Sequence, residues 1–277
     1  MNKLSIVIVN YKMSEHVRRC LDTLKLEIDD LPGNVKVMVV DNASADGLGD
    51  LIKTVYPWAD FIGLPANVGF SRAQNVGLKA NPAEYYLILN PDTVFLPGQK
   101  TLRRWLDFMD SHPKIGLTGP KILNPNLTLQ YSCYRFPSFW QPLFSRTKLG
   151  EGKLGKKMNA NFLMLDFDHE ETQPVDWVMG SAMMIRQAAA AAVGFFDEMF
   201  WMYAEDSDLC RRLWEKGYPV YYLHDVVVVH EHRRGSARVP GVLRAVIKNR
   251  LTREHLKSWF KYNWKWRGNK KYYERIP

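Results

Sequence analysis

Four short apolar runs, each followed by polar residues, dominate the first ninety residues. They cover residues 4–9, 35–40, 61–65 and 85–89. Their apolar positions are nearly continuous rather than alternating, which is typical of strands buried on both faces of a parallel sheet. The pattern therefore predicts four buried β-strands in this part of the chain.

Helical periodicity fills the segments between these strands. Residues 14–28 carry an apolar face, with Ser14 as the expected N-cap. Helices are also expected over 45–56 and 70–80, and Pro82 marks the end of the second. Strands that alternate with helices predict βαβ units and a doubly wound, mostly parallel sheet of the α/β class.

The pattern loosens after residue 115. We expect a fifth strand over 115–123, then an irregular stretch over 124–175, and no linker that divides two independent domains. The remaining expected elements are a glycine-containing strand over 175–185, a helix over 204–216, and two strands over 220–223 and 226–230.

Polar side chains follow each of the first four strands. Asn10, Asp41, Asn67 and Asp92 stand at or just beyond the strand ends. In doubly wound sheets ligands bind beyond the carboxyl ends of the strands, so these side chains are expected along one rim. The alternative for each position is a turn or a helix cap, for which Asn, Asp and Ser are also favoured.

The formal charge of +9 is concentrated at the C-terminal end. Residues 244–277 hold eleven Lys/Arg and two Asp/Glu, while the other 243 residues hold 27 of each sign. Arg253, Lys257, Lys261 and Lys265 recur every four residues beside several aromatic side chains, which predicts an amphipathic basic helix. It is interpreted either as a helix that packs on the body or a second subunit, or as an anchor on an anionic membrane. No nucleic-acid partner is expected, because no recognised binding motif accompanies the charge.

Length, composition and cysteine usage limit the class of protein. The 277 residues are 46% hydrophobic and 24% charged, as in an ordinary globular chain. Three scattered cysteines do not form a disulfide framework, and the N-terminal apolar run is too short for a signal peptide. No apolar segment has the length of a transmembrane helix. These features predict a cytoplasmic protein, and the basic tail leaves open a peripheral position on the inner face of the cell membrane.

Three groups of residues are candidates for chemistry. Asp92, in Asn90-Pro91-Asp92, is a candidate ligand for Mg²⁺ or Mn²⁺, which take carboxylates and substrate phosphates. Glu205, Asp206 and Asp208 open a predicted helix with more acids than capping requires, so one carboxylate is a candidate general base. His230 ends a strand and is placed to reach the same rim.

Other common motifs are absent or misplaced. Gly150–Gly155 matches G-x-G-x-x-G, but no strand precedes it, so we expect a mobile loop rather than a dinucleotide site. Neither a Walker A motif nor a G-x-S-x-G motif is present. These absences exclude P-loop NTPases and α/β-hydrolases.

The order and spacing of seven segments closely resemble glycosyltransferase family 2, and within it the rhamnosyltransferase-like branch. The resemblance covers about residues 4–236 and leaves the tail outside. The segments are IVIVNYK, VVDNAS, ANVGFSRAQNVG, LILNPD, DWVMGSAMMIR, FFDEMFWMYAEDSDLCRRLWEKGY and VVVVHEHRRGS.

This resemblance implies a GT-A fold, an α/β architecture in which a Rossmann-like, mostly parallel central sheet flanked by helices merges with an acceptor half. The implied organisation is a domain over 1–236, divided into a nucleotide-sugar half (1–120) and an acceptor half (121–236). The basic aromatic tail over 237–277, expected to be helical from its own periodicity, follows this domain. The resemblance implies that Asp206, with Glu205, is catalytic and that Asp92 and His230 bind the metal. It implies a pocket for the acceptor and the donor sugar at Trp177, Gly180 and Ser181. The residues implied to bind the nucleotide-sugar are Asn10, Tyr11, Asp41, Asn42, Asn67, Gly69, Arg72, Asn75 and Asn90.

The implied activity is inverting transfer of a sugar from a nucleoside diphosphate sugar to a hydroxyl of a glycan or lipid-linked glycan. Such enzymes serve bacterial cell-surface polysaccharide synthesis, with dTDP-rhamnose or a UDP-sugar as the expected donor and Mg²⁺ or Mn²⁺ as cofactor. The sequence is also compatible with assembly into a homo-oligomer. The alternatives are a sugar-phosphate nucleotidyltransferase, whose Gly-rich N-terminal signature is missing, and a non-catalytic module that binds membrane or nucleic acid through the tail.

Overall fold

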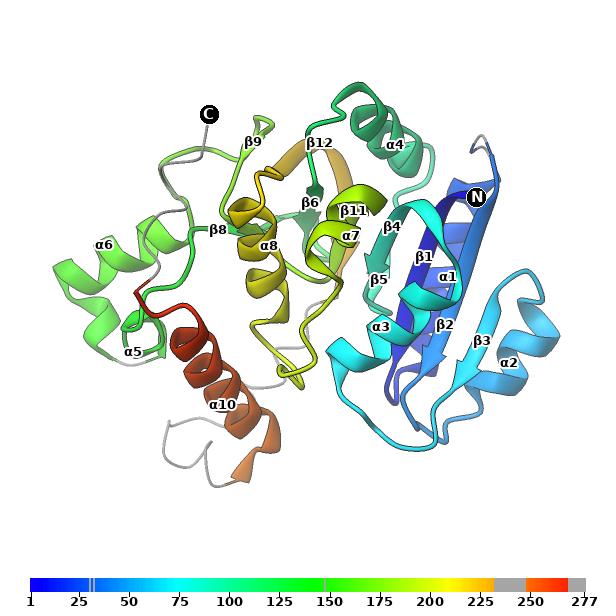
Figure 1. Ribbon diagram of the computed structural model, residues 1–277, viewed down its shortest axis with the longest axis horizontal. Helices are drawn as coiled ribbons and strands as arrows, with labels where there is room; N and C mark the ends of the chain where they lie inside the picture. The colour runs from blue at the N-terminus through cyan, green and yellow to red at the C-terminus, as the bar shows by residue number, and fades with distance from the viewer. Residues whose placement is uncertain (30, 32, 147, 232–247, 269–277) are drawn as a thin grey trace.

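A single long sheet runs through the molecule, with helices packed on both of its faces (Figure 1). The computed structural model describes residues 1–29, 31, 33–146, 148–231 and 248–268. Within these ranges the sheet has the strand order β3-β2-β1-β4-β11-β6-β12-β5, with β7 paired to β6 and β9 paired to β12. The predicted α/β class with a helix-flanked central sheet is confirmed.

The first half of the chain builds the parallel part of the sheet. β1 lies at its centre, paired in parallel with β2 and β4, and β2 pairs in parallel with β3. The elements are β1 (Asn2–Asn10), α1 (Ser14–Ile28), β2 (Val35–Asp41), α2 (Leu48–Val55), β3 (Asp60–Gly63), α3 (Phe70–Ala80) and β4 (Ala83–Leu89).

The second half makes the sheet mixed. β11 runs antiparallel between β4 and β6, whereas β6 and β12 are parallel to each other. The elements are β5 (Thr93–Val94), α4 (Thr101–Ser111), β6 (Leu117–Leu123), β7 (Leu129–Gln130), β8 (Cys133–Tyr134), α5 (Gln141–Arg146), the 3₁₀ helix η1 (Lys148–Glu151), α6 (Lys153–Phe162), β9 (Gln173–Pro174), β10 (Trp177–Val178), β11 (Ala182–Arg186), α7 (Gln187–Val193), α8 (Glu205–Glu215), β12 (Val220–His230) and α10 (Arg250–Lys265).

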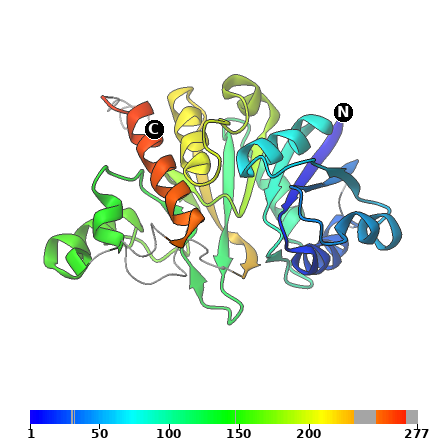
Figure 2. The same ribbon diagram turned by 90° about the horizontal axis from the view of Figure 1, so that it is seen from below.

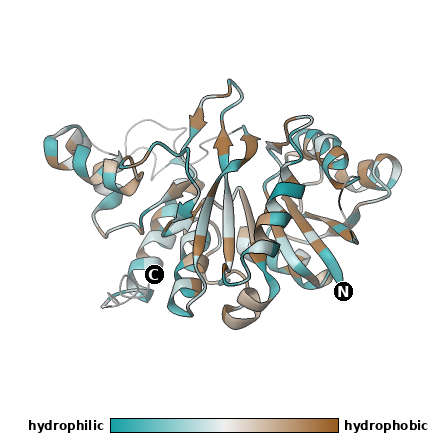
Figure 3. Ribbon diagram, turned by 90° about the horizontal axis from the view of Figure 1, so that it is seen from above, coloured by the Kyte–Doolittle hydropathy of each residue, from teal (hydrophilic) through white to brown (hydrophobic). Residues whose placement is uncertain are grey.

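Side chains alternate along each buried strand and fill two cores. Leu4, Ile6 and Ile8 of β1 face the core under α1, α2 and α4. Val7 and Val9 face the opposite core, which α3, α7 and α8 cover. The hydropathy colouring of Figure 3 shows apolar residues along the strands. Burial on both faces explains why these strands show continuous apolar runs.

Four details of the expected secondary structure are wrong. Ser14 begins α1 instead of capping it; Met13 is the N-cap residue, and Asp46 Oδ2 accepts the Ser14 N–H at 3.2 Å. Segment 175–185 is split into β10, which pairs with β8 in a small second sheet, and β11 in the main sheet. The two closing strands are one strand, β12, whose register shifts between Leu223 and Val227.

The fourth detail is the stretch 124–175, which was expected to be irregular. It contains α5, η1 and α6, at the left edge of Figure 1. Gly150–Gly155, expected as a loop, falls in η1 and the start of α6. An added Cβ at Gly150 would lie 2.0 Å from the Phe144 carbonyl oxygen, so the close packing of these short helices requires glycine there.

The basic tail forms a helix that packs against the body. α10 lies beside α8 in Figures 1 and 2, and its Tyr262 is 2% exposed. Of the two interpretations of the tail, packing on the body therefore holds for residues 250–265. In the part of the chain that the structure describes, no helix has the combination of length and apolarity that crossing a bilayer requires. His232, and the tail residues outside 248–268, lie outside the described residues.

Candidate active site

The strand register brings the predicted rim residues to one end of the sheet. Asn10 pairs with Asp41 across β1 and β2, and Ile8 pairs with Leu89 across β1 and β4. Asp92 follows Leu89 by three residues and therefore lies at the same end as Asp41. The expected convergence of the strand ends is confirmed.

Asn10 joins the ends of the first two strands. Its side-chain amide donates to Asp41 Oδ1 at 2.7 Å, to Ser44 Oγ at 3.0 Å and to Asp46 Oδ2 at 3.1 Å. Asp41 Oδ2 in turn accepts the Ser44 N–H at 3.0 Å. These bonds fix the 41–46 loop against the end of β1, while Tyr11 beside it is 44% exposed.

Asn42 and Asn67 shape the turn before α3. Asn42 accepts the Val68 N–H at 2.9 Å and donates to Asn67 Oδ1 and to the Gly69 carbonyl. Gly69 has φ +91° and ψ 173°, a conformation that essentially only glycine adopts. An added Cβ would stand 2.4 Å from the Trp201 carbonyl oxygen, so glycine is also required by a close approach of two chain segments.

Arg72 and Asn75 of α3 contact the loop that follows α7. Arg72 forms an ion pair with Glu198 at 2.8 Å, and Asn75 donates to the Phe196 carbonyl at 2.9 Å. Asn75 also accepts the Phe196 N–H at 3.0 Å. Asn75 therefore holds this loop against α3, whereas the Arg72 side chain, 58% exposed, is accessible from solvent.

Asp92 and His230 face each other at the end of β12. Asp92 Oδ1 lies 3.2 Å from His230 Nε2, and both side chains are at least nine-tenths buried. Gln130 Oε1 lies 2.8 Å from His230 Nδ1, and Gln130 Nε2 donates to Asn124 Oδ1. Since that second bond directs Oε1 towards the ring, Nδ1 is the nitrogen placed to donate to Gln130, and Nε2 is the nitrogen that faces Asp92.

This pair fits one kind of metal site. Within the described ranges, no group of three or more His, Cys, Asp and Glu side chains is placed to hold an ion. A carboxylate with one imidazole does fit a Mg²⁺ or Mn²⁺ ion whose other ligands are substrate phosphates and water. The donor set therefore matches an ion that arrives with a diphosphate.

The acidic pair Glu205-Asp206 begins α8, with Glu205 buried and Asp206 partly exposed. Asp206 Oδ2 accepts the Gly180 N–H at 3.0 Å, and Oδ1 accepts the Ser207 N–H at 2.8 Å. Burial raises the pKa of Asp206, and these backbone donors oppose the rise. Burial, together with the charges of Asp206 and Asp208, raises the pKa of Glu205 well above its usual value. A carboxyl whose pKa is raised above its usual value suits general-base chemistry.

One short segment connects the candidate base with the candidate metal pair. The Gly180 N–H donates to Asp206, and the next residue, Ser181, accepts the Asn90 N–H through its carbonyl at 2.8 Å. Asn90 is two residues before Asp92. Trp177 stands at the start of this segment, stacked on Tyr134 at 4.5 Å between ring centroids. The structure thus joins β4, β10, β11 and α8 at one place.

Asp208, the third acid of the cluster, is occupied elsewhere. It is fully buried, with Arg212 Nε at 2.8 Å, Lys265 Nζ at 2.7 Å and Trp266 Nε1 at 3.0 Å. Three donors, two of them charged, commit this carboxylate to contacts within the protein. Asp206 and Glu205 are therefore the acids of this cluster that are suited to catalysis.

Sequence patterns missed several residues of this site. Ser44 and Asp46 lie in the same loop as Asp41, and three polar residues so close in sequence were a usable signal. Gln130 lies 100 positions from His230, and no local pattern indicates such a pair. The same holds for Lys265 and Trp266, whose partner Asp208 lies 57 and 58 positions away.

The sequence also matches known protein families. The model for glycosyl transferase family 2 matches residues 5–168, more than half of the chain. The chain belongs to glycosyl transferase family 2. A second model, glycosyl transferase family group 2, matches residues 156–266 and so includes α10. The family likeness therefore does not end at residue 236, as expected from the motifs, but takes in most of the tail.

Curated relatives cover most of the chain. It is 29% identical over 252 residues to the N-acetylglucosaminyl-diphospho-decaprenol L-rhamnosyltransferase of Mycobacterium tuberculosis, covering 86% of this chain and 78% of that protein. It is 26% identical over 268 residues to the rhamnosyltransferase WbbL of Escherichia coli K12, covering 93% and 91%. The predicted rhamnosyltransferase-like resemblance is confirmed.

Solved structures share the fold at low identity. A mannosyltransferase from Pyrobaculum calidifontis, in complex with GDP-Man and Mn²⁺, matches 95% of this chain with a TM-score of 0.60 and 18% identity. This chain spans 64% of that protein, less than two thirds of its length. TarS of S. aureus in complex with UDP matches 99% of this chain and 75% of its own, with a TM-score of 0.55 and 15% identity. The GT-A fold is confirmed, and family membership favours an enzyme over a non-catalytic module or a nucleotidyltransferase.

Proposed function

We propose that this enzyme transfers a sugar, with inversion, from a nucleoside diphosphate sugar to a hydroxyl of a lipid-linked glycan in bacterial cell-surface polysaccharide synthesis. The donor proposed is dTDP-rhamnose, with a UDP-sugar as the alternative. The rhamnosyltransferase relatives support the sugar, and the decaprenol in one of their names supports the lipid. The observation that carries the reaction type is Asp206, partly exposed at the start of α8 and held by the Gly180 N–H.

The residues supply the parts that an inverting transfer needs. The acceptor hydroxyl loses its proton as it attacks, and Asp206, with its raised pKa, is proposed to take that proton. A single displacement requires no covalent nucleophile, so one base is sufficient. We assign donor binding to residues 1–120, through Asn10, Asp41, Asn67 and Arg72, and the acceptor side to residues 121–236.

We propose that Asp92 and His230 hold a Mg²⁺ or Mn²⁺ ion. When bound, the ion supplies positive charge that stabilises the departing diphosphate. The 3.2 Å approach of Asp92 Oδ1 to His230 Nε2 supports this pairing. Thermal shift with UDP and with dTDP, each with and without the ion, tests it, since a ligand of the native state raises the melting temperature. Equal shifts with and without the ion would contradict the assignment.

Asp206→Asn tests the proposed base. The change preserves size but removes basicity, so turnover should fall by ~10²–10⁴, the usual contribution of acid–base catalysis. Nucleotide affinity, measured by calorimetry, should stay within about twofold, because a residue that acts only in the transition state leaves ground-state binding unchanged. Glu205→Gln, one position away, shows which acid of the pair carries the activity. If Asp206→Asn turns over normally, the proposed base is wrong.

The exposed part of the tail supports a membrane partner. Four aromatic rings form one surface across the 135–140 loop and α10: Phe139, Trp140, Trp259 and Phe260, linked by ring contacts of 4.6–5.2 Å. Trp140 and Phe260 are each 57% exposed. Residues 248–268 carry seven Lys/Arg and one Glu. We propose that this aromatic surface meets an anionic membrane, where aromatic rings and basic side chains are both favoured.

Vesicle sedimentation tests the aromatic surface. The full-length protein should sediment with phosphatidylglycerol-containing vesicles at low salt, less at high salt, and not with phosphatidylcholine alone. Trp140→Ser with Phe260→Ser should abolish sedimentation, whereas Leu26→Ser, an equally exposed apolar residue on α1, should not. Protein that stays in the supernatant, or a double variant that alters only the oligomeric state, would refute the membrane partner.

A further inference from the structure

The loop that leads into α8 lies under α10 along most of its length. Arg250 stacks on Trp201 at 4.7 Å, and His255 stacks on Tyr203 at 4.5 Å between ring centroids. Three hydrogen bonds or ion pairs follow along the helix, from Ser258 to the Met202 carbonyl, from Lys261 to the Met199 carbonyl and from Lys265 to Asp197. Every turn of α10 therefore contacts the segment 197–203.

This loop has a conformation that needs outside support. Tyr203 and Ala204 have φ values of +72° and +66°, in the left-handed region that costs a non-glycine residue free energy. Ala204 is the N-cap of α8, and Glu205 and Asp206 follow directly. The position of the candidate base thus depends on two unfavourable backbone conformations that the surrounding contacts must maintain.

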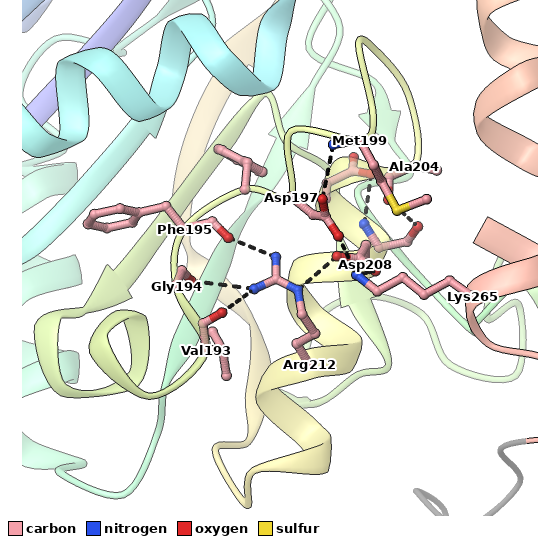
Figure 4. Close-up of polar contacts among 12 residues, drawn as sticks. Val193, Gly194, Phe195, Asp197, Met199, Ala204, Asp208, Arg212 and Lys265 are labelled. Carbon is pink, nitrogen blue, oxygen red and sulfur yellow. Dashed lines mark hydrogen bonds and ion pairs between the residues drawn. The ribbon is translucent and has the colours of Figure 1, made fainter. Parts of the chain in front are cut away.

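Lys265 is the point where three segments meet. Its Nζ lies 2.7 Å from Asp197 Oδ2 and 2.7 Å from Asp208 Oδ1 (Figure 4). Asp208 is also bound by Arg212, whose guanidinium donates to the Val193 and Phe195 carbonyls at 2.7 Å. One lysine of α10 thereby connects the loop before α8 with the first turn of α8, where Asp206 stands.

We propose that Lys265 is a positioning residue for the proposed base, and that α10 is part of the catalytic unit rather than an appended tail. Asp208 is two residues from Asp206 in the same helical turn, so a displaced Asp208 carries Asp206 with it. The same loop touches the donor side, because the Trp201 carbonyl accepts the Phe70 N–H at 2.7 Å at the start of α3. The inference rests on the proposed function, since it requires Asp206 to act as the base.

A double-mutant cycle tests the inference on the full-length protein. Lys265→Met removes the charge and keeps the length, and it should lower kcat by at least ~10-fold while the dissociation constant for UDP or dTDP stays within about twofold. In an Asp206→Asn background the same change should alter kcat by less than about twofold, because residues that act through one another are not additive. Lys257→Met, on the same helix but 63% exposed, is the control that should match the parent.

Each result has a distinct meaning. If Lys265→Met keeps kcat within about twofold, or lowers it equally in both backgrounds, Lys265 does not act through Asp206 and the inference is wrong. If Asp206→Asn alone turns over normally, the failure lies in the proposed function, in its assignment of Asp206 as the base. Melting temperature is measured for every variant. Should Lys265→Met not fold, Lys265→Gln replaces it in the same cycle, with the same two criteria.

Discussion

Gly69→Ala tests whether the turn before α3 and the loop before α8 require their close approach. Gly69 has φ +91° and ψ 173°, and an added Cβ would lie 2.4 Å from the Trp201 carbonyl oxygen and 2.6 Å from Trp201 Cδ1. Contacts below 3.0 Å do not occur for real Cβ atoms, and the nearest atom belongs to backbone. The alanine must therefore separate the two segments.

Gly194 provides the matched control. It has nearly the same conformation, φ +74° and ψ 176°, but an added Cβ there meets nothing within 4 Å. Alanine at either position costs ~1–3 kcal/mol for the unfavourable backbone. At Gly69 the steric conflict adds another ~1–3 kcal/mol, typical of overpacking. The difference between the two variants isolates the approach to Trp201.

Thermal unfolding and donor kinetics measure this difference. At ~2–4 °C per kcal/mol for a domain of ~150–250 residues, Gly69→Ala should melt at least ~2 °C below Gly194→Ala. The KM for the donor should rise only in Gly69→Ala, because the Phe70 N–H loses the Trp201 carbonyl and the start of α3 shifts. Equal melting temperatures for the two variants would refute the steric argument.

Three further predictions concern the ionisable groups of the site. The pKa of Glu205 is raised by burial and by two neighbouring carboxylates, so its contribution to stability is present at low pH and is lost as pH rises through the folded pKa. Glu205→Gln should therefore melt above the parent at neutral pH and lose that advantage on acidification; no advantage at neutral pH would contradict this. Burial raises the pKa of Asp206, so kcat should fall on acidification at a pH above the ordinary aspartate value of about 4, and a fall only at or below that value would disprove the shift. Gln130→Leu should weaken Mn²⁺-supported nucleotide binding by ~10–100-fold in calorimetry, the usual effect of losing a metal ligand's partner, and leave ion-free binding unchanged.

Local sequence determined the elements of the parallel half and the place of its ligand site. The expected helix over 70–80 is α3, Phe70–Ala80, because apolar spacing and Pro82 fix both its face and its end. The convergence of Asn10, Asp41 and Asp92 followed from the strand assignments alone. Parallel strands carry their carboxyl ends to the same edge, so a correct strand pattern is sufficient to place their terminal side chains.

Tertiary structure decided which basic side chains of the tail are paired with acidic residues of the body. The sequence gives residues 248–268 seven basic side chains, which indicated a surface element. Lys265 is instead paired with Asp197 and Asp208, and Trp266 donates to Asp208, on segments about 60 residues away. Charge counted along the chain does not reveal which charges will be neutralised by folding.

The same limit applies to Gln130, which orients His230 across 100 residues, and to segment 175–185, whose apolar residues divide between two sheets. Periodicity reports which face of an element is buried, because the helix and the strand have fixed repeats of 3.6 and 2.0 residues. It carries no information about which distant element covers that face. Partners of that kind are set by how the strands and helices pack in three dimensions, and here that packing completes both the candidate metal site and the support of the candidate base.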